Sequence, residues 1–143
     1  MIVVDTSAMV ELLLQTPLGI RVEARLVRDV AEFHAPHLLD VEVVQALRRL
    51  VRMRELSAPR AGEAIEDLAG LDLHRHPHVD LVDRAWMLRD NLTVYDGMYL
   101  ALAEALDAPL VTCDGALGKA AAAAPGELRR AGRGHTARVE VIR

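Results

Sequence analysis

Four acidic residues stand where segments that resemble strands or helices begin or end, and these are Asp5, Glu42, Asp96 and Asp114. Each has an ordinary structural role, because Asp caps helix N-termini and an acid in a first helical turn is stabilised by the helix dipole. Asp96 also stands three residues after Thr93, which is the spacing of a capping box. Taken one at a time, these acids need no function beyond helix capping.

The four acids gain a second interpretation when their segments are placed in one parallel sheet. In such a sheet the carboxyl ends of the strands and the following helix N-termini share one edge, where ligands bind. Four anions converging there would repel one another and raise each other's pKa values unless a cation neutralised them. Ligation by oxygen alone suits Mg²⁺ or Mn²⁺. The pattern therefore predicts a metal site made of these four acids.

The elements that must position the acids alternate along the chain. Short apolar runs predict strands, and capped or amphipathic segments between them predict helices. The predicted strands are 2–4, 33–35, 71–74, 109–112 and 139–142. The predicted helices are 8–15, 17–30, 38–53, 57–71, 79–89, 93–106 and 114–124. This alternation predicts an α/β fold with a central parallel sheet, in a single domain over residues 1–143.

Composition excludes several classes of protein. The chain has 143 residues, of which 52% are hydrophobic and 27% charged, so a folded globular domain is expected. Cys113 is the only cysteine, which excludes a disulfide framework within the chain and a multi-cysteine zinc site. Apolar runs stay well short of the roughly 18 residues of a membrane span, and no signal peptide is evident. We therefore expect a cytoplasmic protein.

The charge balance also bears on function. The chain carries 21 acidic and 17 basic residues, a net charge of −4, which is not the basic footprint typical of a nucleic-acid-binding protein. Setting the four candidate ligands aside leaves 21 − 4 = 17 acids against 17 bases, so the excess charge equals the proposed site. Aromatic residues make up only 3%, which argues against a base-stacking platform.

Several other residues have both a structural and a functional interpretation. Arg49 lies seven residues after Glu42, so it could share the face of that acid and meet a phosphate, or simply face solvent. His74, His76 and His78 alternate as metal ligands on a strand would, but Pro77 interrupts them and favours a polar strand end. The arginines of the 123–138 loop could touch RNA or lie in a solvated loop. Trp86, Tyr99 and Cys113 are expected in the core.

Taken in order, the motifs resemble those of a PIN-domain ribonuclease. They are Asp5-Thr6-Ser7 after an apolar start, Glu42 in a helix after a proline, Thr93-Val94-Tyr95-Asp96 leading into Tyr99-Leu100-Ala101-Leu102-Ala103, and Val111-Thr112-Cys113-Asp114. The length and the run from Arg84 to Thr93 are similar to VapC-type toxins of type II toxin–antitoxin systems. The resemblance implies a three-layer α/β/α fold around the central parallel sheet.

The same resemblance implies a set of functional residues. Asp5, Glu42, Asp96 and Asp114 would be the catalytic residues and the ligands of Mg²⁺ or Mn²⁺. Thr6, Ser7 and Thr112 would orient ligands or waters. Gly97 departs from the Ala or Ser typical after Asp96, and the 123–138 loop is longer than usual.

The resemblance further implies an activity and partners. The protein would hydrolyse phosphodiester bonds in a structured RNA such as tRNA or rRNA and so inhibit translation. It would form a homodimer and bind a VapB-like antitoxin whose C-terminal segment covers the acidic cleft, without a membrane partner. The alternatives are a housekeeping RNA-processing nuclease of the same fold, and a PIN-fold binding module without catalysis.

Overall fold

A computed structural model describes residues 1–28, 32–123 and 137–143, and its centre is a parallel sheet. The strands are β1 (Ile2–Val4), β2 (Phe33–Pro36), β3 (Leu73–His76), β4 (Leu110–Thr112) and β5 (Val139–Val141). They lie in the order β3-β2-β1-β4-β5, and every neighbouring pair is parallel. The predicted α/β fold with a parallel sheet is confirmed. The third strand lies two residues later than predicted, because Arg75 and His76 pair with β2.

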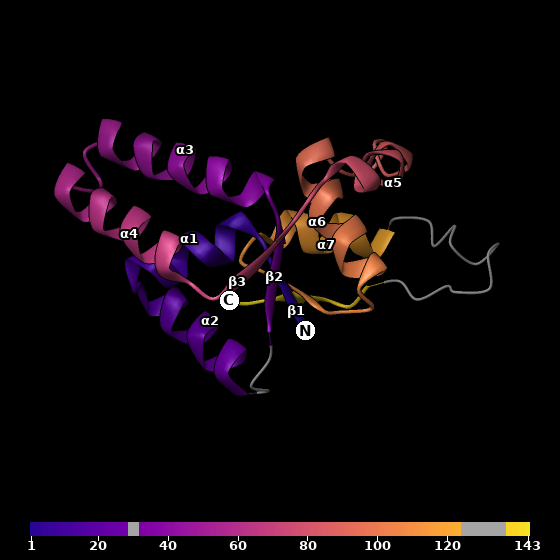
Figure 1. Ribbon diagram of the computed structural model, residues 1–143, viewed down its shortest axis with the longest axis horizontal. Coiled ribbons are helices and arrows are strands. Elements are labelled where there is room, and N and C mark those ends of the chain that lie inside the picture. Colours follow the sequence, from indigo (N-terminus) through magenta and orange to yellow (C-terminus); the bar gives the residue numbers. More distant parts are fainter. Residues whose placement is uncertain (29–31, 124–136) are drawn as a thin grey trace.

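Helices cover both faces of this sheet, as Figure 1 shows. They are α1 (Thr6–Leu14), α2 (Pro17–Arg28), α3 (Leu38–Arg52), α4 (Ala58–Gly70), α5 (Val82–Met87), α6 (Val94–Ala105) and α7 (Gly115–Ala123), with a 3-10 turn η1 (Val79–Leu81) before α5. The helices α1 to α4 lie on one side of the sheet and α5 to α7 on the other, which is the three-layer arrangement that was expected. Side-chain caps explain several starts, since Asp5, Ser57 and Thr93 accept hydrogen bonds from the first turns of α1, α4 and α6.

The buried face of α2 differs from the prediction. The periodicity predicts Ile20 and Val27 on the inner face, but Gly19, Val22 and Leu26 are buried there instead. The reason is a close approach between helices. A Cβ atom on Gly19 would lie only 2.0 Å from the carbonyl oxygen of Glu11 in α1, so the helix turns its glycine side inward.

The segment 79–89 is also less regular than predicted. It forms the short turn η1 followed by the six-residue helix α5. Leu81, Ala85 and Leu88 face the core, which leaves Trp86 61% exposed. The expectation that Trp86 is a core residue was therefore wrong, whereas Tyr99 is buried as expected.

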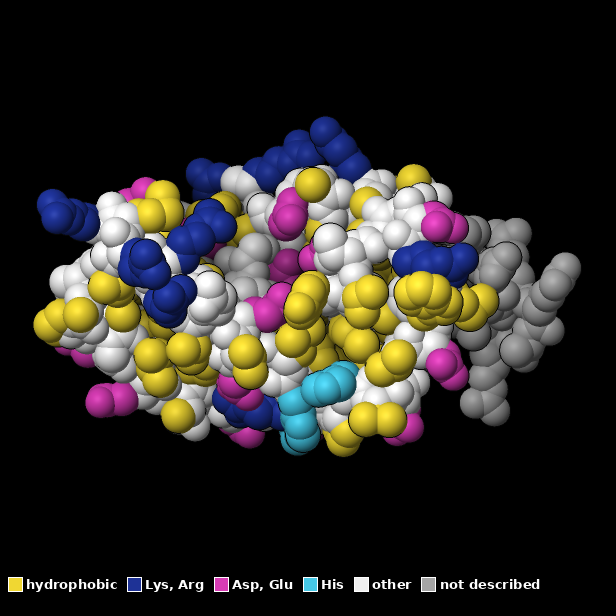
Figure 2. All heavy atoms as spheres, turned by 90° about the horizontal axis from the view of Figure 1, so that it is seen from above, with side chains coloured by type: hydrophobic (Ala, Val, Ile, Leu, Met, Phe, Trp, Pro, Cys, Tyr) yellow, Lys and Arg dark blue, Asp and Glu magenta, His cyan; other side chains and the backbone are white. Residues whose placement is uncertain are grey.

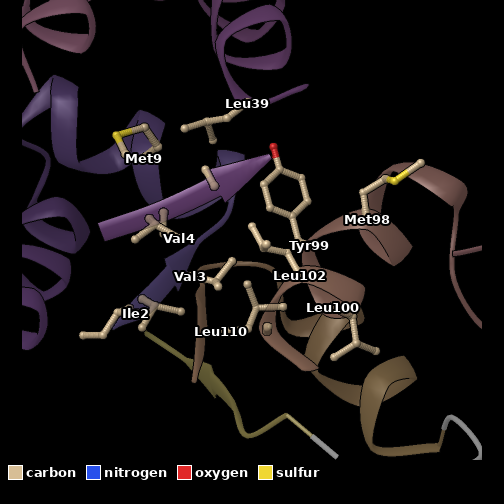
Figure 3. Packing of buried hydrophobic residues seen from close by; sticks show 14 of the residues in the cluster. Ile2, Val3, Val4, Met9, Leu39, Met98, Tyr99, Leu100, Leu102 and Leu110 are labelled. Atoms are coloured by element: carbon tan, nitrogen blue, oxygen red, sulfur yellow. The ribbon is translucent and has the colours of Figure 1, made fainter. Parts of the chain in front are cut away.

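The core lies where β1 meets α6, and this packing brings the first acid to the middle of the sheet. Ile2, Val3 and Val4 are all buried in the strand that pairs with both β2 and β4. Figure 3 shows Val3 directed toward Leu102 and Tyr99 of α6, whereas Ile2 and Val4 point to the opposite face of the sheet, on the side of Met9. Asp5 follows directly, and its backbone N–H continues the ladder to the carbonyl of Val111 at 3.1 Å. Within the described residues, every helix is too short or too polar to cross a membrane.

Candidate active site

The edge at which the strands end opens into a cleft of about 760 Å³, and all four predicted acids line it. They come from different elements: Asp5 lies between β1 and α1, Glu42 in α3, Asp96 in α6 and Asp114 after β4. Figure 2 looks onto this edge and shows acidic side chains at a central hollow, with basic side chains gathered on the side of α3 and α4. The predicted supporting residues Thr6 and Ser7 also line the cleft, as does Arg49.

Asp5 is the most buried of the four acids, at 5% exposure. Its Oδ1 accepts hydrogen bonds from the Ala8 N–H at 2.9 Å and the Ser7 hydroxyl at 2.8 Å, and its Oδ2 accepts one from the Thr112 hydroxyl at 2.6 Å. Burial raises the pKa of the Asp5 carboxyl above its ordinary value, and the negative charge of Asp96 raises it further. The three hydrogen bonds oppose this rise. Asp5 is thus a carboxylate held in a place that disfavours its charge.

Ser7, in the first turn of α1, and Thr112, the last residue of β4, link these two elements beneath Asp5. The Ser7 hydroxyl accepts a hydrogen bond from the Cys113 N–H at 2.8 Å, and it lies 3.1 Å from the Thr112 hydroxyl. Thr112 in turn accepts from the Asp114 N–H at 2.9 Å. These hydrogen bonds therefore fix the Asp5 carboxylate relative to the backbone of Asp114, although the two residues lie far apart in the sequence.

Glu42 is held by two hydroxyl groups from other elements. Thr6 Oγ1 donates to Glu42 Oε2 at 2.8 Å, and Tyr99 OH donates to the same oxygen at 2.6 Å. Burial and the neighbouring Glu42 raise the pKa of the Tyr99 hydroxyl far above its ordinary value, so Tyr99 remains a proton donor. Among the described residues nothing donates to Oε1 of Glu42, which leaves that oxygen available to a ligand.

Tyr99 was missed as a site residue, because its place in an apolar helix predicts the core. Figure 3 shows its ring packed in that core with the hydroxyl directed out of it, toward the start of α3. The available signal was its position three residues after Asp96, which places both side chains on one face of α6.

Asp96 and Asp114 keep the helix-capping role that each suggests alone. Asp96 Oδ2 accepts from the Thr93 hydroxyl at 2.7 Å, while its N–H donates to the same hydroxyl oxygen at 3.1 Å. Asp114 Oδ1 accepts from the Ala116 N–H at 2.7 Å at the start of α7. The structural and functional interpretations are therefore compatible, since each acid caps or begins a helix while lining the cleft.

The donor set suits a hard divalent cation, because it consists of carboxylates, one of them destabilised by burial and a like charge. In their present positions, no three acidic, histidine or cysteine side chains among the described residues lie close enough to hold an ion. Each carboxylate instead bonds to hydroxyl or backbone N–H groups. A bound cation would have to draw the four acids together from the walls of the cleft.

Glu11 is a further acid in the cleft wall, and it was not predicted as a site residue. Glu11 lies one turn after Ser7 in α1, so the helical period alone could have placed it on this face. Its carboxylate accepts a hydrogen bond from the Thr16 hydroxyl. Burial, Asp5 and Glu11 together raise the pKa of the Cys113 thiol to about 11, so this thiol stays protonated and is not a nucleophile at neutral pH.

The remaining candidate residues lie away from the cleft. His74 and His76 are part of β3 and group with His34 of β2, whose Nδ1 lies 2.9 Å from His76 Nε2, whereas His78 follows the strand. This is the polar strand end that was expected. Of the loop arginines, Arg138 forms an ion pair with Glu140 at 3.4 Å, and positions 124–136 lie outside the described residues.

Comparisons with known proteins show the family to which this chain belongs. The family described as "PIN domain" matches residues 2–123, which is most of the chain. This chain belongs to the PIN-domain family. It is 39% identical to Ribonuclease VapC12 of Mycobacterium tuberculosis over 142 residues, or 99% of each chain. It is 44% identical to Ribonuclease VapC1 of the same organism over 125 residues, covering 87% of this chain and 90% of that one. The PIN domain is therefore of the VapC group.

Solved PIN structures share the fold at much lower identity. VapC20 of M. tuberculosis, described as a sarcin-ricin loop cleaving toxin, superposes with a TM-score of 0.64 at 15% identity, over 84% of this chain and 95% of that one. A protein of Pyrobaculum aerophilum, PAE2754, gives a TM-score of 0.63 at 24% identity, over 83% and 78% of the two chains.

Proposed function

We propose that this VapC-group PIN domain is an endoribonuclease that depends on Mg²⁺ or Mn²⁺ and hydrolyses phosphodiester bonds in structured RNA. The observation that carries the proposal is the convergence of Asp5, Glu42, Asp96 and Asp114 on one cleft, in a chain that is 39–44% identical to VapC ribonucleases. These four acids would hold the metal, and they are the proposed catalytic residues.

The residues around the acids have distinct tasks in this reaction. A bound divalent metal would supply an activated water and stabilise the leaving oxygen. Ser7 and Thr112 hold Asp5, while Thr6 and Tyr99 hold Glu42 with its Oε1 free. These hydrogen bonds already fix the rotamers of Asp5 and Glu42, so the remaining cost of assembling the site is the movement that brings the four acids together around the metal.

Arg49 would supply the positive charge that attracts the RNA. It is exposed at the cleft wall, and no acid among the described residues pairs with its guanidinium. An arginine in that position can bind a phosphate through two parallel hydrogen bonds. An acidic protein would thus hold an acidic polymer through its metal and a few local arginines rather than through its overall charge.

The biological proposal is a toxin that cleaves tRNA or rRNA and thereby inhibits translation. In support, one protein with the same fold, VapC20, is described as a sarcin-ricin loop cleaving toxin. The partner of this chain would be a VapB-like antitoxin. An arginine of that antitoxin, placed among the four carboxylates, would compete with the metal by charge. We also propose that the protein acts as a homodimer.

Growth and cleavage assays test this proposal together. Expressed alone in a bacterium, the wild-type protein should arrest growth, whereas Asp96→Ala should not. Asp90→Ala is the matched control, because its side chain is 82% exposed and lies outside the cleft, so this variant should remain toxic. Equal growth of the wild type and Asp96→Ala at matched protein levels would contradict a toxin. Metal-dependent RNA cleavage without growth arrest would favour a housekeeping nuclease. The absence of both cleavage and growth arrest would favour a binding module.

A further inference from the structure

A second, smaller pocket of about 430 Å³ lies beside the active cleft and is called the side pocket here. It is formed by one face of α3 from Leu38 to Arg49, by Tyr95 in the first turn of α6 and by Thr6 of α1. The residues shared by its lining and that of the cleft are Thr6, Glu42, Ala46 and Arg49. The side pocket and the cleft therefore adjoin, so a ligand that occupies the side pocket lies next to the residues of the cleft.

The side pocket presents an aromatic ring and an aliphatic wall to solvent. Tyr95 is 59% exposed and stands immediately before Asp96, while Val41 is 69% exposed on the opposite helix. Leu38 completes the apolar part of the lining. Tyr95 has no hydrogen bond or ring contact with any described residue, whereas the other exposed aromatic, Trp86, already carries the Arg89 guanidinium at 4.8 Å.

Two polar side chains at the side pocket are also without partners among the described residues. The Gln45 amide can both donate and accept hydrogen bonds, as the edge of a nucleobase requires. Arg49 stands one turn further along α3 and supplies a positive charge where this pocket meets the cleft. Proteins recognise an unpaired nucleotide by such a combination: an exposed aromatic ring, aliphatic side chains, a group that both donates and accepts hydrogen bonds, and a positive charge.

We propose that the side pocket binds one unpaired nucleobase of the RNA substrate, stacked on Tyr95, next to the phosphate that is cut. This inference rests on the proposed ribonuclease function and assigns a part of the substrate to a part of the surface. The base lies against the ring and Val41, its edge meets Gln45, and its phosphate passes Arg49 toward Glu42. Low aromatic content does not oppose this subsite, because one exposed ring beside the acids is enough to stack one base.

The subsite gives the enzyme a reason to prefer loops over continuous duplex. A base must leave its helical stack to enter the side pocket, and this costs least in a single-stranded or looped segment. Stacking is tolerant of sequence, so selectivity among bases would come from Gln45.

The test compares RNA binding by wild type, Tyr95→Ala, Tyr95→Phe and Trp86→Ala. The probe is a short single-stranded RNA of mixed sequence that carries a fluorescent purine analogue quenched by stacking, used with Ca²⁺ in place of Mg²⁺ to limit cleavage. Tyr95→Ala should weaken binding roughly 5- to 150-fold and abolish the quenching. Tyr95→Phe keeps the ring and should bind within about twofold of wild type. Trp86→Ala removes the exposed aromatic outside the pocket and should change neither quantity.

The outcomes separate this inference from the proposed function. If the wild type cuts RNA but Tyr95→Ala binds and quenches as wild type does, the subsite is refuted and the nuclease stands. If the wild type neither binds nor cuts RNA, both proposals fail. A second copy of the chain is the alternative occupant of the side pocket, and the oligomeric state, measured by light scattering, tests for it. A Tyr95→Ala protein that loses self-association while keeping its RNA affinity would assign the side pocket to a second copy of the chain and overturn the inference.

Discussion

Replacing Asp5 by Asn should abolish metal-dependent cleavage and leave the protein as stable as wild type, or more stable. The amide oxygen can keep the hydrogen bonds from Ala8 and Ser7, and its NH₂ group can donate to Thr112. The Thr112 hydroxyl would then donate to Ser7, which lies 3.1 Å away. No buried polar group is left without a partner, while a charge disfavoured by burial and by Asp96 is removed.

The matched variant Asp5→Ala separates the effect of charge from that of hydrogen bonding. It removes the helix cap of α1, worth about 0.5–2 kcal/mol. It also removes the acceptor of both the Ser7 and the Thr112 hydroxyl, and because only one of the two can donate to the other, one hydroxyl is left without an acceptor, worth about 1–3 kcal/mol. We therefore expect a loss of about 2–4 kcal/mol, or roughly 8–16 °C in Tm for a chain of this size. Asp5→Asn should instead gain up to about 1 kcal/mol, or about 4 °C, since Asn caps helices as well as Asp.

The stability difference between wild type and Asp5→Asn should depend on pH. Because the folded pKa of Asp5 is raised, its carboxyl favours folding fully only below the unfolded value of about 4, and that contribution is lost as pH rises through the folded value. The advantage of Asp5→Asn over wild type should therefore be present at neutral pH and shrink on acidification. Both proteins are measured by calorimetry in EDTA, and added Mg²⁺ should raise the Tm of the wild type more than that of Asp5→Asn.

Two results would refute this reasoning. Undiminished RNA cleavage by Asp5→Asn, with contaminating nuclease excluded, would remove Asp5 from the metal site. Equal losses of Tm in Asp5→Asn and Asp5→Ala would show that the network of hydroxyl groups does not accept an amide.

Three further predictions concern residues around the site and in the scaffold. Arg49→Ala should reduce the slope of log affinity against log salt by about one, measured on RNA in Ca²⁺, and an unchanged slope would place the phosphate contact elsewhere. Arg84→Ala strips the Glu104 carboxylate, whose side chain is 3% exposed, of its 2.7 Å ion pair. It should cost about 3–5 kcal/mol in urea unfolding, and a cost under about 1 kcal/mol would contradict this. Burial and neighbouring histidines lower the pKa values of His34 and His76, so stability should fall as pH drops below about 6.5. His76→Gln should reduce that fall, and an equal fall in both proteins would assign it to other groups.

The parallel sheet and the four acids were predictable because they depend on local patterns and one topological rule. Short apolar runs marked the strands, and Asp5 and Thr93 marked helix starts. Strand ends and helix starts must then share an edge, which brings distant acids to one cleft. No contact between individual side chains had to be known for this step.

What could not be predicted depends on such contacts. The hydrogen bond from Tyr99 to Glu42 joins residues 57 positions apart, and hydrophobic periodicity describes only the ring of Tyr99. The inner face of α2 is set by the close approach of Gly19 to α1, which overrides the apolar pattern of Ile20 and Val27. The exposure of Trp86 follows from the break between η1 and α5, which changes the face that α5 turns inward.

Gly97 lets α5 rest almost directly on the backbone of α6. A methyl group at Gly97 would lie 3.2 Å from the Cα atom of Ala85, so Gly97→Ala would force the two helices apart by a few tenths of an ångström. The same first turn of α6 carries Asp96. None of the residues that line the cleft comes from α5, yet Ala85 of α5 packs directly against this turn. A larger residue at position 97 would therefore shift the Asp96 carboxylate relative to the other three acids, although position 97 itself lies outside the lining of the cleft.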